Sequence, residues 1–283
     1  MKRIIVILLL LVSSLFVVPA EAINRALVIG IGEYPVESGW NIINGDDDIV
    51  IINELLLQNG FNSKNINIIS NSKATYQDII RAIDDLITVS SKNDVVYIHF
   101  SGHGQLITDV SGDEESGFDE AWIPYDAYKS YSEGIYEGQN HLVDDELNTK
   151  LHALRDKVGA SGKIIVIADA CHSGGGSRDE EDVIFRGTKH SFNIPSKHVF
   201  SSSNKTEDWV YISACKSYQF NQQCLSHPYG SLSYAIYLLR DDISLLSTND
   251  LVKKIRTIIS TLVKFSQTPE VNSPAKYLEL PLF

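Results

Sequence analysis

Short apolar runs, each long enough for one buried strand, alternate along this chain with segments of helical periodicity. Aliphatic runs occupy 25–30, 65–69, 94–100 and 163–168, and the segment 75–89 places its apolar residues on one helical face. Parallel strands need such crossover segments, and both of their faces must be covered. The alternation therefore predicts an α/β fold with a mainly parallel central sheet flanked by helices.

The rest of the chain extends this pattern and interrupts it twice. Further helices are expected at 49–58, 143–157, 231–240 and 248–266, and a further strand at 210–213. Two stretches, about 108–139 and 174–204, are instead rich in Gly, Ser and charged residues and predict long loops. Long loops in a compact domain are more often functional than accidental.

Two of the predicted strands end in polar loops that carry glycine. The run at 94–100 is followed by Ser-Gly-His103-Gly, and the run at 163–168 by Asp-Ala-Cys171-His-Ser-Gly. The carboxyl ends of parallel strands meet at one edge of a sheet, where open α/β sheets build their sites. We therefore expect the His103 imidazole and the Cys171 thiol to share that edge.

A thiol beside an imidazole is the chemistry of a cysteine hydrolase. The imidazole removes the thiol proton, and the thiolate attacks a carbonyl carbon. The backbone N–H groups of Gly104 and Cys171 are the candidate oxyanion hole, because glycine frees the backbone to turn sharply. A single buried cysteine is usually a small hydrophobe, but its pairing with a histidine at matched strand ends favours catalysis. We expect the neighbouring His172 to have a structural or surface role.

Two other classes of protein are considered. His99 and His103 are four residues apart, a spacing that suits a metal pair on a helix, but they fall across a strand-like run and lack the glutamate of zinc peptidases. The second alternative is a noncatalytic binding or adaptor module, which would usually have lost the histidine or the cysteine. Both residues are present in this chain.

The two loops, taken together, resemble the catalytic segments of caspase-like peptidases and specifically those of the metacaspase branch. Further segments resemble other parts of that family in the same order, namely 46–61, 74–75, 112–126, 213–219 and 267–269. The resemblance implies a caspase-like three-layer fold over 23–283 and the activity of a cysteine endopeptidase with a Cys-His dyad.

The resemblance also implies a pocket for a basic side chain. Asp48, Asp169 and Ser101 match the family's positions around the residue before the scissile bond, which implies cleavage after Arg or Lys. A buried opposite charge discriminates strongly, most of all toward the planar guanidinium group. Two points stay open: Asp48 suits a helix N-cap equally well, and the adjacent Asp46 and Asp47 leave the register uncertain by one residue.

Calcium is the cofactor that the resemblance implies. Asp119, Asp144 and Asp145 match the family's calcium-binding aspartates, and Asp179 approximates a fourth with one inserted residue. Calcium prefers several carboxylates brought together from loops, and it would act by ordering the acidic loops around the cleft. Because the chain has no EF-hand spacing, a solvated acidic loop is the alternative.

The loop 174–204 contains four basic residues that the resemblance marks as candidate processing positions: Arg178, Arg186, Lys189 and Lys197. The alternative for each of them is an ordinary solvated loop residue.

The amino terminus has the layout of a cleavable secretory signal. Residues 1–22 begin with Lys2 and Arg3, continue through an apolar stretch, and close with Ala-Glu-Ala ahead of Ile23. A retained membrane anchor is the alternative, although the apolar core is short for a span. We therefore expect a secreted or periplasmic protein without membrane contact once the signal is removed.

The net charge limits the kinds of partner that the protein can bind, and the cysteine content limits its disulfides. The formal net charge is −12, which argues against nucleic acid and favours basic peptides or cations. The three cysteines are too few for a disulfide scaffold; Cys215 and Cys224 either pair with each other or stay buried as thiols. We expect a monomer acting on basic peptide or protein substrates.

Overall fold

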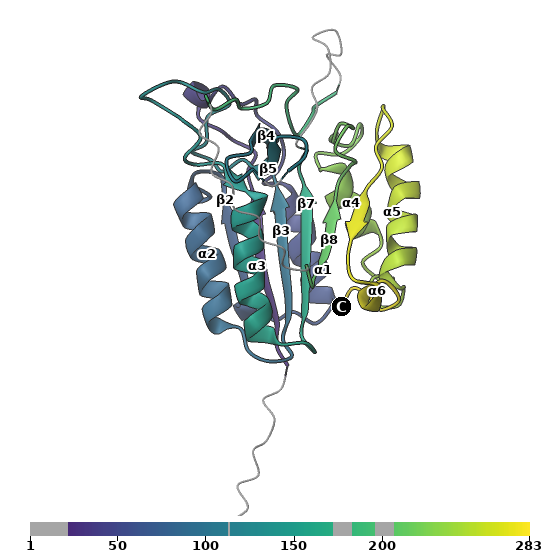
Figure 1. Ribbon diagram of the computed structural model, residues 1–283. Helices are drawn as coiled ribbons and strands as arrows, with labels where there is room; N and C mark the ends of the chain where they lie inside the picture. Colours follow the sequence, from purple (N-terminus) through teal and green to yellow (C-terminus); the bar gives the residue numbers. More distant parts are fainter. Residues whose placement is uncertain (1–21, 113, 172–182, 196–206) are drawn as a thin grey trace, which may run out of the picture.

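A six-stranded sheet forms the centre of the computed structural model, which describes residues 22–112, 114–171, 183–195 and 207–283 (Figure 1). The strand order is β2-β1-β3-β7-β8-β9. All neighbours are parallel except β8 and β9. The strands are β1 (Asn24–Gly30), β2 (Ile66–Ser70), β3 (Val95–Ser101), β7 (Lys163–Asp169), β8 (Val210–Ser213) and β9 (Glu270–Asn272).

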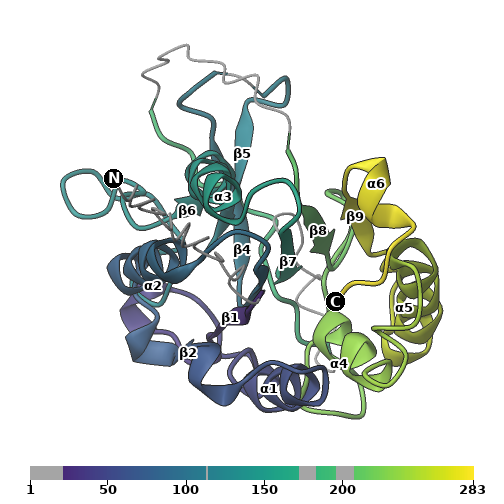
Figure 2. The same ribbon diagram turned by 90° about the horizontal axis from the view of Figure 1, so that it is seen from below.

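Helices cover both faces of this sheet (Figure 2). One face carries α2 (Tyr76–Val89) and α3 (Asp144–Val158), and the other carries α1 (Asp48–Gln58), α4 (Ser231–Leu238) and α5 (Thr248–Leu262). A short helix, α6 (Ala275–Leu278), lies near the carboxyl terminus. The predicted three-layer α/β fold is confirmed, with strand and helix positions within a few residues of the expected ones.

Successive residues of the central strands point to opposite faces of the sheet and belong to two different hydrophobic cores. Because both faces are buried, these strands have continuous apolar sequences. In β3, Ile98 and Phe100 face the core under α2 and α3, whereas Tyr97 belongs to the core under α1, α4 and α5. In β7, Val166 belongs to the core under α2 and α3, and Ile167 belongs to the core under α1, α4 and α5. Period-two alternation with both faces buried is the pattern expected of a parallel sheet between two helical layers.

The prediction of one long loop at 108–139 is wrong in part. Phe118–Trp122 forms β5, which pairs antiparallel with β4 (Gly104–Thr108) and with the two-residue β6 (Leu142–Val143). The polar composition concealed this strand, because only one of its faces packs against the core. This small sheet matters for the site, because β4 begins directly after His103.

Parts of the chain with predictions attached lie outside the described residues. Of the predicted signal at 1–22, only Ala22 is described, and Asp179, Arg178, His172 and Lys197 are not. Within the described ranges, no helix combines the length and the apolar character needed to cross a bilayer. The three cysteines are free and buried, which corresponds to the unpaired alternative.

Candidate active site

The register of the central strands brings the two glycine-bearing loops together. Ser101 at the end of β3 pairs with Asp169 at the end of β7. His103 and Cys171 each follow two residues later, and the intervening Gly102 N–H donates to the Asp169 carbonyl at 3.4 Å. The two residues therefore lie at the carboxyl ends of adjacent central strands.

The His103 ring is buried and held by its neighbours. It stacks on Trp40 with ring centroids 4.7 Å apart, and Nε2–H donates to the Asn41 carbonyl at 2.8 Å. This bond leaves the lone pair on Nδ1, which has no hydrogen-bond partner among the described residues. Burial lowers the pKa of His103 to about 3, so the ring is neutral. The neutral ring therefore presents an unengaged Nδ1 lone pair, the atom that a general base has to offer.

The Cys171 thiol is also buried. It donates to the Gln219 carbonyl at 2.9 Å and lies 3.3 Å from the Cys215 sulfur. A hydrogen bond with Cys171, followed by burial, raises the pKa of Cys215 well above its ordinary value. Cys215 therefore remains a protonated thiol. Cys171 is the cysteine that follows the strand next to the histidine loop, and it is the candidate nucleophile.

Both predicted oxyanion-hole donors point at one oxygen atom. The Cys171 N–H donates to the Arg186 carbonyl at 2.9 Å, and the Gly104 N–H donates to the same carbonyl at 3.3 Å. Two backbone donors converging on a single carbonyl oxygen is the arrangement that stabilises the oxyanion of acyl transfer.

The three predicted pocket residues come together around the side chain of that same arginine. Asp48, Ser101, Asp169 and Arg186 are all fully buried. The Arg186 Nη1 donates to Asp48 Oδ2 at 2.7 Å and to Ser101 Oγ at 2.5 Å, and it lies 3.7 Å from Asp169 Oδ2. Nη2 donates to the Asn44 carbonyl at 3.2 Å. The pocket thus binds a guanidinium group between two carboxylates.

The structure answers both questions that the sequence left open for Asp48. Asp47 occupies the N-cap position of α1, whereas the Asp48 side chain points into the pocket and accepts from the Gly230 N–H at 2.9 Å. Asp46 accepts from Asn71 instead. Burial raises the pKa of Asp48 to about 6, while Arg186 acts to lower it and Asp169 to raise it.

The carboxyl-terminal part of the chain completes the pocket with residues that sequence reasoning missed. Asn221 donates to Asp169 Oδ1 at 2.7 Å, and the N–H and hydroxyl of Ser233 donate to Asp169 Oδ2 at 2.8 and 2.7 Å. A Cβ atom on Gly230 would lie 2.6 Å from Arg186 Cζ, so glycine keeps this wall open. No motif in the sequence marks these positions, because only the fold brings them to Asp169.

The metal-pair alternative for His99 and His103 has no support in their contacts. The two ring nitrogens of His99 lie 3.1 Å from the Tyr97 hydroxyl and 3.1 Å from the Ser233 hydroxyl. His103 instead bonds Asn41. Each ring therefore belongs to a separate hydrogen-bond network.

One of the predicted calcium ligands, Asp119, lies in an acidic cluster at the far end of the β4–β5 hairpin. Carboxylate oxygens of Asp109, Glu114 and Asp119 all lie within 4.8 Å of one another. Asp119 Oδ1 is buried without a hydrogen-bond partner among the described residues. Burial, followed by Glu114, raises the pKa of Asp119 to about 8. Sequence reasoning missed Asp109 and Glu114.

The other predicted ligands begin the neighbouring helix. Asp144 and Asp145 are the first two residues of α3, and burial, followed by the charge of Asp119, raises the pKa of Asp144 to about 7. The raised carboxyl pKa values of Asp119 and Asp144 thus reflect burial first and repulsion between neighbouring carboxylates second.

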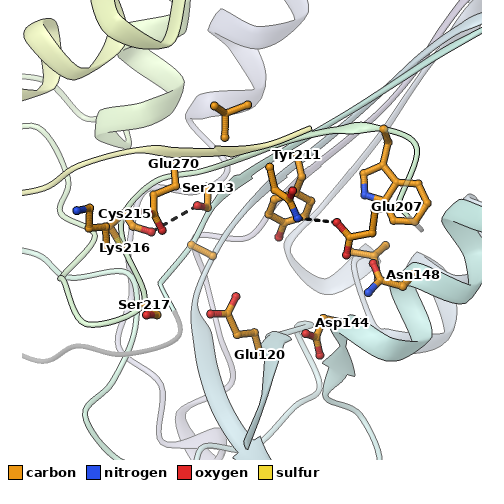
Figure 3. Close-up of a pocket in the computed structure, with 15 residues that line it drawn as sticks. Glu120, Asp144, Asn148, Glu207, Tyr211, Ser213, Cys215, Lys216, Ser217 and Glu270 are labelled. Carbon is orange, nitrogen blue, oxygen red and sulfur yellow. Dashed lines mark hydrogen bonds between the residues drawn. The ribbon is translucent and has the colours of Figure 1, made fainter. Parts of the chain in front are cut away.

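A cavity of about 440 Å³ opens beside Cys215 (Figure 3), whose sulfur lies 3.3 Å from that of the candidate nucleophile. Ala170 and Cys215 line it, and four carboxylates face it from different elements: Glu120, Asp144, Glu207 and Glu270. With four carboxylates against the single ammonium of Lys216, the cavity is acidic, which suits a positively charged polypeptide.

Solved structures share this fold. Protein GSU0716 from Geobacter sulfurreducens matches with a TM-score of 0.66 and 21% identity, over 92% of this chain and 97% of that one. Caspase-1 from Spodoptera frugiperda matches with a TM-score of 0.60 and 11% identity, over 89% of each chain.

Curated relatives are metacaspases. Metacaspase-1 of Schizosaccharomyces pombe is 26% identical over 88% of this chain and 67% of that protein. Metacaspase-4 of Arabidopsis thaliana is 31% identical over 51% of this chain, and Metacaspase-1B of Aspergillus fumigatus is 39% identical over 35% of it. The chain spans about a fifth of the length of the Aspergillus relatives that it matches.

The family model described as Caspase domain matches residues 23–278, which include every element of the fold. This chain therefore belongs to the caspase domain family of cysteine peptidases, and its curated relatives make it metacaspase-like.

Proposed function

We propose that this protein is a cysteine endopeptidase that cleaves peptide bonds after Arg or Lys. One observation carries the proposal: the Arg186 guanidinium is bound between two buried aspartates while its carbonyl oxygen accepts from Gly104 and Cys171. A substrate arginine placed in the same way would present its carbonyl carbon beside the nucleophile. Orientation of this kind supplies much of the rate enhancement of an enzyme.

The chemistry is acyl transfer by the Cys-His dyad. His103 Nδ1 takes the proton of the Cys171 thiol, and the sulfur attacks the substrate carbonyl carbon. The N–H groups of Gly104 and Cys171 stabilise the oxyanion. His103 then protonates the leaving amine, and water hydrolyses the thioester, which restores the thiol.

The charges of the pocket determine the substrate. Asp48 and Asp169 are fully buried and hydrogen-bonded, so an uncharged or acidic side chain would leave their charge uncompensated. Arginine fits best because its planar group bonds several acceptors at once, whereas lysine offers a single point charge. Hydrolysis should therefore be faster after Arg than after Lys.

Calcium is proposed as an activating ion held by the acidic cluster. Asp109, Glu114 and Asp119 have the hard oxygen donors that calcium prefers, and the unpartnered Asp119 Oδ1 is available as a ligand. Bound calcium supplies positive charge that offsets carboxylate repulsion. Asp119 pairs with Ile107 of β4, the strand that begins at the oxyanion donor Gly104. Ordering the hairpin would therefore fix that donor.

We also propose that residues 1–22 direct the protein out of the cytoplasm, since their order of charged, apolar and small residues is that of a secretory signal. The exported protein is proposed to be a monomer. Amino-terminal sequencing of protein recovered outside the cytoplasm should begin at Ile23. Recovery of the uncleaved chain in membranes would favour the anchor alternative.

Reporter peptides that end in Arg, Lys or Asp before a fluorogenic amide test the activity. We expect hydrolysis in the order Arg, then Lys, with none after Asp, and an increase when calcium is added. Cys171→Ala should abolish hydrolysis. Cleavage that persists in this variant, or cleavage after Asp, would contradict the proposal, and silence of wild-type protein under all conditions would favour the adaptor alternative.

A further inference from the structure

The side chain of Trp40 lies against the candidate general base. Trp40 belongs to the segment 31–47, which joins β1 to α1. Its indole is stacked on the His103 imidazole, with ring centroids 4.7 Å apart and planes inclined by 25°. Both side chains are buried, with 5% of Trp40 and 2% of His103 exposed to solvent. The indole therefore shields one face of the imidazole from water.

The stacked indole also sets the direction of the imidazole nitrogens. The carbonyl that accepts from His103 Nε2–H at 2.8 Å belongs to Asn41, the residue directly after Trp40. A rotation of the imidazole out of the stacked plane would break this hydrogen bond. Because the two nitrogens belong to one rigid ring, the same contact aims the lone pair on Nδ1. Trp40 and Asn41 thus orient the base together.

Other groups hold the backbone of His103. Its N–H donates to the Tyr34 hydroxyl at 3.0 Å, and that hydroxyl donates to the Ile123 carbonyl at 3.1 Å. The Ile123 N–H in turn donates to the His103 carbonyl at 3.0 Å. Loss of the Trp40 ring would therefore loosen the histidine side chain and leave its backbone in place.

An indole at position 40 costs the folded protein free energy. The Trp40 Nε1–H is buried and has no hydrogen-bond partner among the described residues. A buried donor without a partner loses its hydration and gains no hydrogen bond in return. Phenylalanine would also present a flat ring and would avoid this cost. A residue that breaks a rule of stability in this way is typical of a functional site.

The pocket end of the same segment is anchored independently of Trp40. Asn44, whose carbonyl accepts from the bound guanidinium, donates its own N–H to Gln223 Oε1 at 2.8 Å. The Ile43 N–H donates to the Gly32 carbonyl at 2.9 Å. A change at position 40 is therefore expected to affect the base and to leave binding of the basic side chain unchanged.

We propose that Trp40 is a positioning residue for the reaction of Cys171, an inference that rests on the proposed function. Its ring holds the His103 imidazole where Nε2–H meets the Asn41 carbonyl and where Nδ1 takes the thiol proton. Trp40 itself exchanges no proton and acts through His103. Orientation of a catalytic group within about 1 Å can change a rate by about 100-fold.

Burial under the indole also keeps the imidazole neutral. Burial is the main cause of the lowered pKa of His103, and the charges of Lys129 and Arg186 act in the same direction. The Lys129 ammonium lies over the Trp40 ring at 5.3 Å, and burial keeps the Tyr34 hydroxyl protonated. Removal of the indole would admit water and move the pKa of His103 toward its ordinary value near 6.5. A protonated imidazole cannot act as the base, so such a variant should lose turnover as the pH falls through about 6.

Steady-state kinetics with an Arg reporter tests the proposal. Trp40→Ala should lower kcat about 30-fold, which is part of what a general base contributes, and leave KM within about twofold. The acid limb of kcat should move up by about one pH unit. In the substrate complex Asp48 is already bound to the basic side chain, so kcat reports the base. Trp40→Phe should restore kcat to within about threefold, and its free energy of unfolding should not be lower than that of the wild type.

Ile42→Ala is the matched control, because Ile42 lies in the same segment and is largely exposed. This variant should keep the kcat and the pH profile of the wild type. Trp40→Leu keeps the test decisive if Trp40→Ala does not fold, since leucine fills space without a flat ring. Its kcat should fall as in Trp40→Ala, and a value equal to that of Trp40→Phe would overturn the inference.

Three further results would also overturn the role of Trp40 and leave the proposed function standing: an unchanged kcat in Trp40→Ala, a loss carried by KM alone, or an acid limb that does not move. Each of them is measured against an active wild-type protein. Silence of the wild type toward every reporter would instead overturn the proposed function and this inference together.

Discussion

At the scale of single residues, a substitution at Asp48 tests how the pocket recognises a basic side chain. The recognition rests either on the buried charge of Asp48 itself or on the general negative charge of the region. Asp48→Asn keeps the side-chain shape but removes a buried charge that bonds the guanidinium. We expect kcat/KM for an Arg reporter to fall about 100-fold or more, because breaking a buried charge pair costs several kcal/mol.

The adjacent Asp47 provides the control for this change, since it is exposed and has no bond to Arg186 among the described contacts. Asp47→Asn should leave kcat/KM within about twofold. Equal losses for the two variants would show that the pocket assignment is wrong. Steady-state kinetics with the reporter peptide is the measurement.

The sulfur atoms of Cys171 and Cys215 lie 3.3 Å apart, close enough for a modest rearrangement to join them. Treatment with a peroxide, which accepts the two electrons released, is expected to form a disulfide between them and to remove activity. A dithiol reductant should restore it. Thiol titration of the unfolded protein, without reductant, should show the loss of two thiols out of three.

Cys215→Ala distinguishes this disulfide from oxidation of the nucleophile alone. In that variant, peroxide should still inactivate, but the dithiol should restore less activity because Cys171 advances to higher oxidation states. Recovery equal to that of the wild type would contradict a role for Cys215. Cys224 is buried elsewhere and should stay reduced in both proteins.

At the scale of elements, a cut at any candidate processing position in the loop 174–204 falls between two strands that pair with each other. Strand β7 lies on the amino-terminal piece and β8 on the carboxyl-terminal piece, and they share a parallel register from Ile165–Val210 to Ala168–Ser213. Each face of this pair is buried, so separation would expose core residues to water.

We therefore expect the two pieces to remain one folded unit after cleavage. Size-exclusion chromatography of the cleaved protein should give a single peak at the position of the intact chain, and denaturing electrophoresis of that peak should give two bands. Elution of separate pieces in buffer would contradict the role assigned to the β7–β8 pair. The uncleaved Cys171→Ala protein is the reference for the elution position.

At the scale of the whole molecule, buried histidines link folding to pH. The ring of His99 is fully buried between Tyr97 and Ser233, and burial lowers its pKa to about 4 despite the favourable charge of Asp169. The unfolded chain binds a proton at the ordinary value near 6.5, so it binds more protons than the folded chain between pH 6.5 and 4. Stability must then fall as pH falls through this window.

The free energy of unfolding, obtained from denaturant titrations at pH 7 and pH 5, measures this contribution of His99 to stability. His99 alone should contribute a loss of roughly 2 kcal/mol between these pH values. In His99→Gln, the difference between the two pH values should shrink by that amount, whatever the absolute stability of the variant. An unchanged difference would mean that His99 is not held neutral in the folded protein.

The fold was largely predictable because its determinants are local. Apolar runs such as 94–100 and 163–168 can be covered only between two helical layers, and strand ends fix where a following loop emerges. The expected meeting of the loops that carry His103 and Cys171 follows from that rule. Strand β5 was missed, because its half-exposed sequence resembles a polar loop.

The candidate site was predictable only where the sequence carries a motif. Asp48, Ser101 and Asp169 were named through a resemblance to a known family, and the structure brings them together around one guanidinium. Asn221, Ser233 and Gly230 had no such signal, because their role depends on where α4 packs.

The sequence by itself determined the layered α/β architecture and the two loops that carry the thiol and the imidazole, since hydrophobic periodicity and strand order act over short stretches of chain. Only the tertiary structure decided that Arg186 occupies the pocket with its carbonyl between Gly104 and Cys171. The physical reason is that a buried ion pair between residues 138 positions apart exists only once the sheet has brought them together.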